Sequence, residues 1–80
     1  MASAPDRQVK GFGEAVRARR EELEISQEQL GFRAKIHRTY VSDVERGARN
    51  PTVKVIWKLA LALETLPSSL FQYSEKRLGL

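Results

Sequence analysis

Helix start and stop signals recur along this chain at intervals too short for long helices. Ser26, Thr52 and Pro67 suit helix starts, and Gly47 suits the residue that follows a helix. The residues between these signals are rich in good helix formers, and no alternating apolar pattern persists. We therefore expect an all-α fold in which five short helices pack into one compact domain.

The expected helices follow from local patterns. A stripe of apolar residues at helical spacing marks the first helix, and Ser26 with Gln29 forms a capping box at the start of the second. The third begins near Arg38, after only three connecting residues, and ends at Gly47. The expected helices span residues 9–23, 27–34, 38–46, 53–63 and 67–73.

The domain organisation follows from these ranges. We expect a flexible N-terminal arm over residues 1–6, one domain over residues 7–73 and a C-terminal tail over residues 74–80. A chain of this length buries only about 60% of its unfolded surface, so its core is marginal. We therefore expect a second subunit to contribute to its stability.

The composition excludes several kinds of site. The chain has no cysteine and a single histidine, His37, so disulfides, thiolate chemistry and sulfur-ligated zinc are excluded. The longest apolar run, residues 57–63, is broken by Lys58, and the N-terminal residues lack the pattern of a secretory signal. We expect a cytoplasmic protein with no membrane span, no metal and no cofactor.

Two superficial matches to enzyme motifs fail. The sequence GFGEAV, which begins at Gly11, lacks the third glycine of a dinucleotide-binding motif, because Val16 stands there. The residues His37, Ser42 and Asp43 are of the types found in a hydrolase triad. A short exposed helix would neither bury nor orient them. We therefore expect no enzyme activity.

Basic residues are concentrated in the middle of the chain. The net charge is +4, and residues 30–51 contribute +3 of it, from five basic and two acidic side chains, whereas residues 1–24 balance five against five. A basic patch attracts phosphates, anionic lipid or acidic proteins alike, and it also suits a solvated face. The charge alone leaves these alternatives open.

The helix expected from Arg38 has two unlike faces. At about 100° per residue, Val41 and Val44 fall on one side. The opposite side carries Arg38, Thr39, Ser42, Asp43 and Arg46. Ser, Thr and Asp lower helix stability, yet with Arg they are the types that contact base edges in the major groove. With the preceding helix and its three-residue turn, this pattern predicts a helix-turn-helix that binds double-stranded DNA.

A resemblance to a known family rests on three motifs at their mutual spacing: SQEQL, YVSDVERG and RNPT. The stretch from Ile25 to Leu63 that contains them resembles the lambda-repressor-like, Cro-type (XRE) helix-turn-helix family. The resemblance covers most of the chain and implies a five-helix DNA-binding domain, usually dimeric. Within the family, residues 38–52 are most similar to controller proteins of restriction-modification systems and other small stand-alone regulators.

The resemblance also implies roles for individual residues. It assigns base reading to Arg38, Thr39, Ser42 and Asp43. It assigns contact with the DNA backbone to Gln27, Arg46, Arg49 and Asn50. Tyr40 borders the reading face, where either a backbone contact or simple packing would suit it. Glu45 matches an acid that pairs, partly buried, with an arginine of the first helix, here Arg20, and the helical wheel separately turns Glu45 toward Val41.

Three positions depart from the family pattern. Gly31 stands where alanine is usual and loosens the second helix, and Lys35 stands where the turn usually has glycine. A positive φ would cost lysine about 1 kcal/mol. Phe32 occupies an outward position where the family is commonly polar, so either another segment covers it or it meets a partner. Of the two, we expect another segment to cover it.

Dimerisation would extend the DNA sequence that one helix reads. Two recognition helices about 34 Å apart would contact successive major-groove faces of an inverted repeat. Either the last helix covers Trp57 and Leu61, or these residues belong to a twofold interface. The residues of that interface would be Trp57, Leu61, Leu66, Leu70 and Phe71.

The expected function is transcriptional regulation by occupancy of a DNA site. The bound dimer would block RNA polymerase or contact it, depending on where the site lies. The alternative is an antitoxin or another protein-interaction module whose main partner is a protein. The sequence determines neither the operator, nor the choice between repressor and activator, nor the regulated genes.

Overall fold

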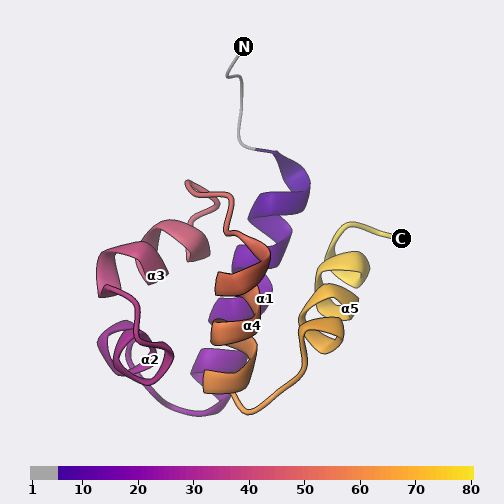
Figure 1. Cartoon of the computed structure of the whole chain (residues 1–80). Helices are drawn as coiled ribbons and strands as arrows, with labels where there is room; N and C mark the ends of the chain where they lie inside the picture. Colours follow the sequence, from indigo (N-terminus) through magenta and orange to yellow (C-terminus); the bar gives the residue numbers. More distant parts are fainter. Residues whose placement is uncertain (1–5) are drawn as a thin grey trace.

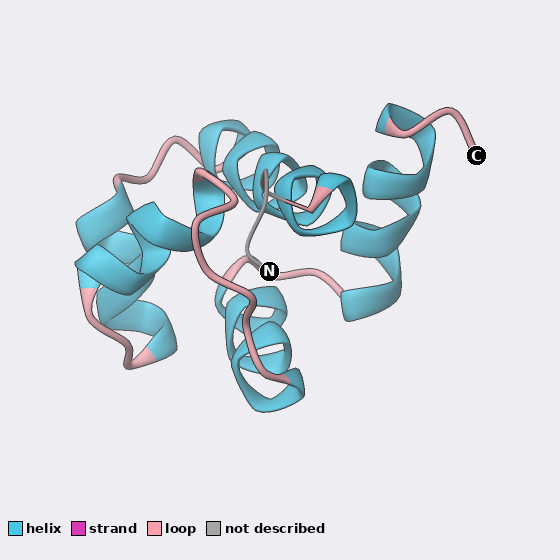
Figure 2. Cartoon of the chain, turned by 90° about the horizontal axis from the view of Figure 1, so that it is seen from above, coloured by secondary structure: helices cyan, strands magenta, loops and turns pink. Residues whose placement is uncertain are grey.

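Five α-helices make up the described part of the chain, residues 6–80, in the computed structural model (Figure 1). They are α1 (Arg7–Glu22), α2 (Gln27–Ala34), α3 (Arg38–Glu45), α4 (Val53–Ala62) and α5 (Pro67–Arg77). Figure 2 shows loops joining these helices and no strand within residues 6–80. The all-α, five-helix fold is confirmed. The expected N-terminal arm lies outside the described residues, apart from Asp6.

Helix α1 lies between α3 and α5 (Figure 1). It packs against α3 and α5, which lie on opposite sides of it in Figure 1. Helix α2 packs against α3 and α4, so the two helices of the predicted helix-turn-helix contact each other. None of the helices within residues 6–80 is both long and apolar enough to cross a membrane.

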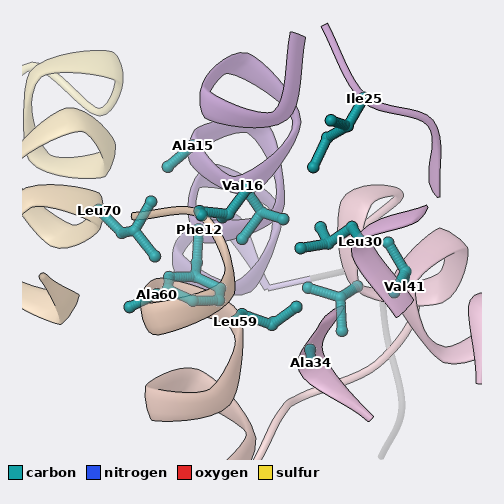
Figure 3. Packing of buried hydrophobic residues seen from close by; sticks show 12 residues of the cluster. Phe12, Ala15, Val16, Ile25, Leu30, Ala34, Val41, Leu59, Ala60 and Leu70 are labelled. Carbon is teal, nitrogen blue, oxygen red and sulfur yellow. The ribbon is translucent and has the colours of Figure 1, made fainter. Parts of the chain in front are cut away.

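Side chains from all five helices form one core, part of which is shown in Figure 3. The buried members are Phe12, Ala15, Val16, Ile25, Leu30, Ala34, Val41, Val44, Leu59, Ala60, Leu63 and Leu70. Burial of this apolar surface is the main force that holds the short helices together. Helix α3 is fixed to the core by its two buried valines.

The helix starts are set by caps. In α2 both bonds of the capping box are present, because Ser26 Oγ accepts from the backbone N of Gln29 at 3.0 Å and Gln29 Oε1 accepts from the N of Ser26 at 2.8 Å. Thr52 Oγ1 accepts from the backbone N of Val55 at 3.2 Å at the start of α4. The expected first residues of α2, α3, α4 and α5 are confirmed.

Helix α1 begins earlier than expected. Asp6 Oδ1 accepts a hydrogen bond from the backbone N of Gln8 at 3.0 Å, so Asp6 is the N-cap and the helix starts at Arg7 rather than Val9. Asp6 therefore belongs to the helical domain. The glycines that follow it lower helix propensity, but they are held in the helix by packing.

The last helix ends later than the expected boundary at Tyr73. Helix α5 continues to Arg77, Ser74 is buried, and the Ser74 hydroxyl donates to the carbonyl O of Leu70 at 3.0 Å. Arg77 Nε donates to Glu14 Oε1 of α1 at 3.2 Å. Residues 74–77 are therefore part of the folded domain and not of a C-terminal tail.

Two glycines allow close backbone contacts. A Cβ at Gly13 would collide with the carbonyl O of Val44, so glycine lets α1 and α3 cross closely. A Cβ at Gly31 would lie 2.7 Å from the carbonyl O of Ile36, in the turn between α2 and α3. Gly31 therefore does more than loosen α2, because its small size gives the turn and the start of α3 room to approach. Lys35 has the predicted left-handed conformation, with φ of 59°.

Candidate nucleic-acid interface

Helix α3 is held at its start by His37. The imidazole Nδ1 of His37 accepts a hydrogen bond from the backbone N of Thr39 at 3.0 Å, which makes His37 the N-cap. On the inner side, Val41 and Val44 are completely buried. The cap and the two valines fix the rotation of the helix about its axis, and with it the direction of every other side chain.

The outer face of α3 collects the residues to which the sequence assigned base reading. Arg38 and Thr39 are exposed in the first turn, and Ser42 and Asp43 follow them, partly buried, one turn later. Arg46 is exposed directly after the last helical residue. The face offers guanidinium and hydroxyl donors together with hydroxyl and carboxylate acceptors, the chemistry that base edges and phosphates require.

The opposite edge of α3 carries a buried ion pair. Arg20 Nε lies 2.7 Å from Glu45 Oε2 and Arg20 Nη2 lies 3.0 Å from Glu45 Oε1, a two-pronged contact between α1 and α3. Arg20 Nη1 also donates to the carbonyl O of Ile25 at 2.9 Å. The hydrogen bonds to Glu45 raise the pKa of the Arg20 guanidinium above its ordinary value, although burial opposes that shift. The pair therefore fixes α3 against α1.

Gln27 joins this buried pair. Its Nε2 donates to Glu45 Oε1 at 3.0 Å, which links the start of α2 to the end of α3. The sequence assigned Gln27 to a DNA phosphate and gave no sign of this bond. An amide nitrogen carries two N–H groups, so the bond to Glu45 is compatible with a phosphate contact.

A second group of charges lies on the outward side of the same helix. Arg46 Nη2 donates to Asp43 Oδ1, and Arg49 Nη2 lies 3.7 Å from Asp43 Oδ2. The guanidinium carbon of Arg49 lies 4.5 Å from the centre of the Tyr40 ring, in a cation–π contact. Tyr40 also packs on the core, so simple packing accounts for part of its role. We call Tyr40, Asp43, Arg46 and Arg49 the outer charge cluster.

Sequence reasoning did not find the outer charge cluster. The spacing of Asp43 and Arg46 by three positions is one at which side chains meet on a helix, and it could have indicated their pair. Arg49 lies with Asn50 in the exposed loop that follows α3, and helical spacing says nothing about the path of a loop.

Phe32 is not covered, contrary to the expectation. Its side chain is 86% exposed on α2. The helix buries Leu30, Gly31 and Ala34 against its neighbours, and this rotation turns Phe32 away from the domain. The described residues place no segment over it.

The predicted interface residues divide into two groups. Trp57, Leu61, Leu66 and Phe71 are 51%, 63%, 59% and 42% exposed. The exposure of Trp57 and Leu61 means that α5 does not cover this side of α4. Leu70 is only 3% exposed and lies among the core side chains in Figure 3, so its assignment to a subunit interface is wrong. Residue 70 points inward because α5 packs on α1 through it.

An exposed apolar residue of α4 was missed. Val53 is 71% exposed, and it precedes Trp57 and Leu61 at intervals of four residues. The three side chains form an exposed stripe along α4. We call this set the α4 stripe.

Among residues 6–80 no group of three His, Asp or Glu side chains is placed to hold a metal ion.

Comparison with known proteins gives concordant results. Residues 16–70 match the family described as Helix-turn-helix. Control protein C.BamHI of Bacillus amyloliquefaciens is 42% identical over 64 residues, which are 79% of each chain. The crystal structure of the restriction-modification controller protein C.AhdI from Aeromonas hydrophila is similar with a TM-score of 0.80 and 40% identity, over 81% of this chain and 98% of that one.

A repressor of known fold is also similar. The solution structure of the DNA-binding domain of the P22 c2 repressor has a TM-score of 0.71 and 34% identity, over 74% of this chain and 78% of that one. The arrangement of the five helices is therefore lambda-repressor-like.

Proposed function

The chain is a helix-turn-helix transcriptional regulator of the Cro-type (XRE) family, and we propose that it binds specific double-stranded DNA sequences as a homodimer, with α3 in the major groove. One observation carries the proposal. Helix α3 is locked to the core by Val41, Val44 and the buried Arg20–Glu45 pair, while its other face offers only polar groups to the outside.

The proposed base contacts come from the beginning of α3. Arg38 and Thr39 are exposed in the first turn, which is the part of a recognition helix that meets base edges. A guanidinium at position 38 matches the two acceptors of guanine, and the hydroxyls of Thr39 and Ser42 suit several bases. Asp43 is the fourth of the proposed base-reading residues, and its carboxylate already contacts two arginines of the protein.

The proposed backbone contacts lie around this face. Arg46, Arg49 and Asn50 follow the recognition helix, and Gln27 opens α2 beside it. Arginine and amide side chains are frequent partners of phosphate oxygens, and such contacts fix the register of a protein on the duplex. Tyr40 would hold the guanidinium of Arg49 in place for its phosphate contact, through the cation–π contact between them.

The proposed dimer interface is the α4 stripe with Leu66 and Phe71. These five side chains are apolar, large and at least 42% exposed, and exposed apolar patches on a small domain mark interaction surfaces. A twofold axis through this surface would pair it with itself and present two α3 helices to an inverted repeat. The function proposed for the dimer is control of a restriction-modification system, which rests on the names of similar proteins.

A salt titration tests DNA binding. Each phosphate neutralised contributes about −0.9 to the slope of log affinity against log salt. Arg49→Ala should weaken binding without changing the preferred base at any position, whereas Arg38→Ala should relax one base position by about 1–3 kcal/mol. Equal losses on specific and random DNA for Arg38→Ala would contradict its role in base reading.

The dimer is tested by light scattering of the wild type and of Leu61→Lys. Leu61 is exposed in the protomer, so lysine there should leave the fold intact while it separates the subunits. Binding to an inverted repeat should weaken in parallel. A wild type that stays monomeric at micromolar concentration even with DNA would contradict this arrangement.

A further inference from the structure

We propose that Asp43 is a positioning residue that sets specificity: its carboxylate holds the guanidinium groups of Arg46 and Arg49 and so limits their binding to phosphates of arbitrary DNA. The inference rests on the proposed function and deepens it. It differs from the base-reading role that the family resemblance implies for Asp43, because it acts through two arginines of the protein.

The geometry of the carboxylate is the first support. Each oxygen of Asp43 faces a different arginine, Oδ1 toward Arg46 and Oδ2 toward Arg49. The Asp43 side chain is 20% exposed, whereas those of Arg46 and Arg49 are 63% and 50% exposed. The least exposed of these three charged side chains therefore joins two long side chains that would otherwise extend into solvent.

The second support is the restraint on Arg49. Its guanidinium lies against the face of Tyr40 as well as near Asp43, so it is held from two sides although it belongs to a loop. The carboxylate also offsets one of the two positive charges. The outer charge cluster thus presents one net positive charge in a defined place rather than two mobile ones.

This arrangement affects specific and non-specific DNA unequally. A guanidinium has five N–H donors, so each arginine can keep its contact with Asp43 and still donate to a phosphate that lies in the right place. On arbitrary DNA the phosphates are less well placed, and the arginines must leave the carboxylate to reach them. Asp43 therefore disfavours non-specific binding and leaves the specific complex preorganised.

The experiment compares wild type with Asp43→Asn, which keeps the size of the side chain and removes its charge. Two duplexes of equal length are titrated across a range of salt concentrations: one enriched by the wild type from a random pool, and one with the same bases scrambled. For the scrambled duplex we expect tighter binding by Asp43→Asn and a log–log slope steeper by about 0.9 for each arginine released. We also expect the ratio of specific to scrambled affinity to fall.

Three variants separate positioning from simple charge. Glu24→Gln makes the same charge change in the exposed turn between α1 and α2, and it should leave the ratio close to that of wild type. Asp43→Glu restores the carboxylate and should recover much of the ratio. Asp43→Asn with Arg46→Ala should lose part of the gain on scrambled DNA, because one released arginine is absent.

The outcomes are distinguishable. A loss confined to one base pair of the enriched duplex, with unchanged binding to scrambled DNA, would show that Asp43 reads a base and would overturn the inference. An equal change in Asp43→Asn and Glu24→Gln would overturn it as a mere charge effect. Failure of the wild type to bind any duplex would overturn the proposed function itself, before any variant is considered.

Discussion

Two carboxylates of α3, two positions apart, meet arginines in opposite ways. Glu45 has a 3% exposed side chain and a two-pronged contact with Arg20, whereas Asp43 is 20% exposed and contacts two largely exposed arginines. Glu45 faces α1 and Asp43 faces outward, because the buried valines fix the rotation of the helix. A carboxylate–arginine contact therefore stabilises the fold on the inner face of α3, and a similar contact on the outer face is available for binding.

Burial decides this difference. Removing one partner of a buried pair leaves an uncompensated charge and costs about 3–5 kcal/mol, whereas exposed pairs contribute about 0–1 kcal/mol. The contact with Glu45 is thus a permanent part of the structure. The contacts of Asp43 are weak enough to exchange when a phosphate arrives.

The largest effect is expected for Arg20→Ala. It strands Glu45 and removes the bond to the carbonyl of Ile25, so the free energy of unfolding should fall by about 3–5 kcal/mol. Urea unfolding followed by circular dichroism measures the change. Arg17→Ala, which breaks an exposed pair with Glu21, is the control and should cost less than about 1 kcal/mol. An unchanged urea-unfolding midpoint for Arg20→Ala would contradict the structural role of the pair.

Gly13→Ala should come next, because it disturbs the crossing that brings α1 and α3 together. The new methyl group would meet the carbonyl groups of Val44 and Glu45, and such overpacking costs about 1–3 kcal/mol. Gly11→Ala is the matched control in the same helix. Its Cβ would lie 3.6 Å from the Leu78 side chain, so the better helix propensity of alanine should make it neutral or stabilising. Equal unfolding midpoints for the two variants would contradict the close crossing.

His37→Ala tests the start of the outer face. Loss of the bond to the backbone N of Thr39 should lower the free energy of unfolding by about 1 kcal/mol. His37→Asn should retain most of the stability, since asparagine is a good N-cap. Thermal unfolding of both variants measures the difference, and identical losses would show that the imidazole does not act as a cap.

The smallest effect on stability is expected for Asp43→Asn. Its partners are exposed, so the free energy of unfolding should change by less than about 1 kcal/mol. The comparison with Arg20→Ala under the same conditions is the measurement. A loss as large as that of Arg20→Ala would mean that the outer charge cluster is part of the fold, and the contrast between the two carboxylates would fail.

The sequence predicted those features that depend on neighbouring residues. The starts of four helices followed from Ser26, Thr52, Pro67 and the short turn before Arg38, because caps and proline act within one helical turn. The inward direction of Glu45 followed from its position beside Val41 on the wheel and from the family resemblance. The first turn of α1 was missed, although Asp6 is a good N-cap residue.

The sequence did not predict features set by the rotation of packed helices. Leu70 and Phe71 are adjacent and both apolar, yet one is buried and the other is exposed, because the packing of α5 on α1 decides which faces inward. The outward direction of Phe32 was predicted correctly, but the segment expected to cover it is absent from the described residues, and helical spacing says nothing about such cover. The contact of Arg49 with Asp43 depends on the path of a loop, which periodicity does not describe.

Selection of bound duplexes from a random DNA pool tests the central claim most directly, that the outward face of α3 recognises a DNA sequence. The account predicts enrichment of an inverted repeat by the wild type, with altered preference at one position of each half-site for Arg38→Ala. Failure of the wild type to enrich any sequence would contradict it and favour a protein as the main partner.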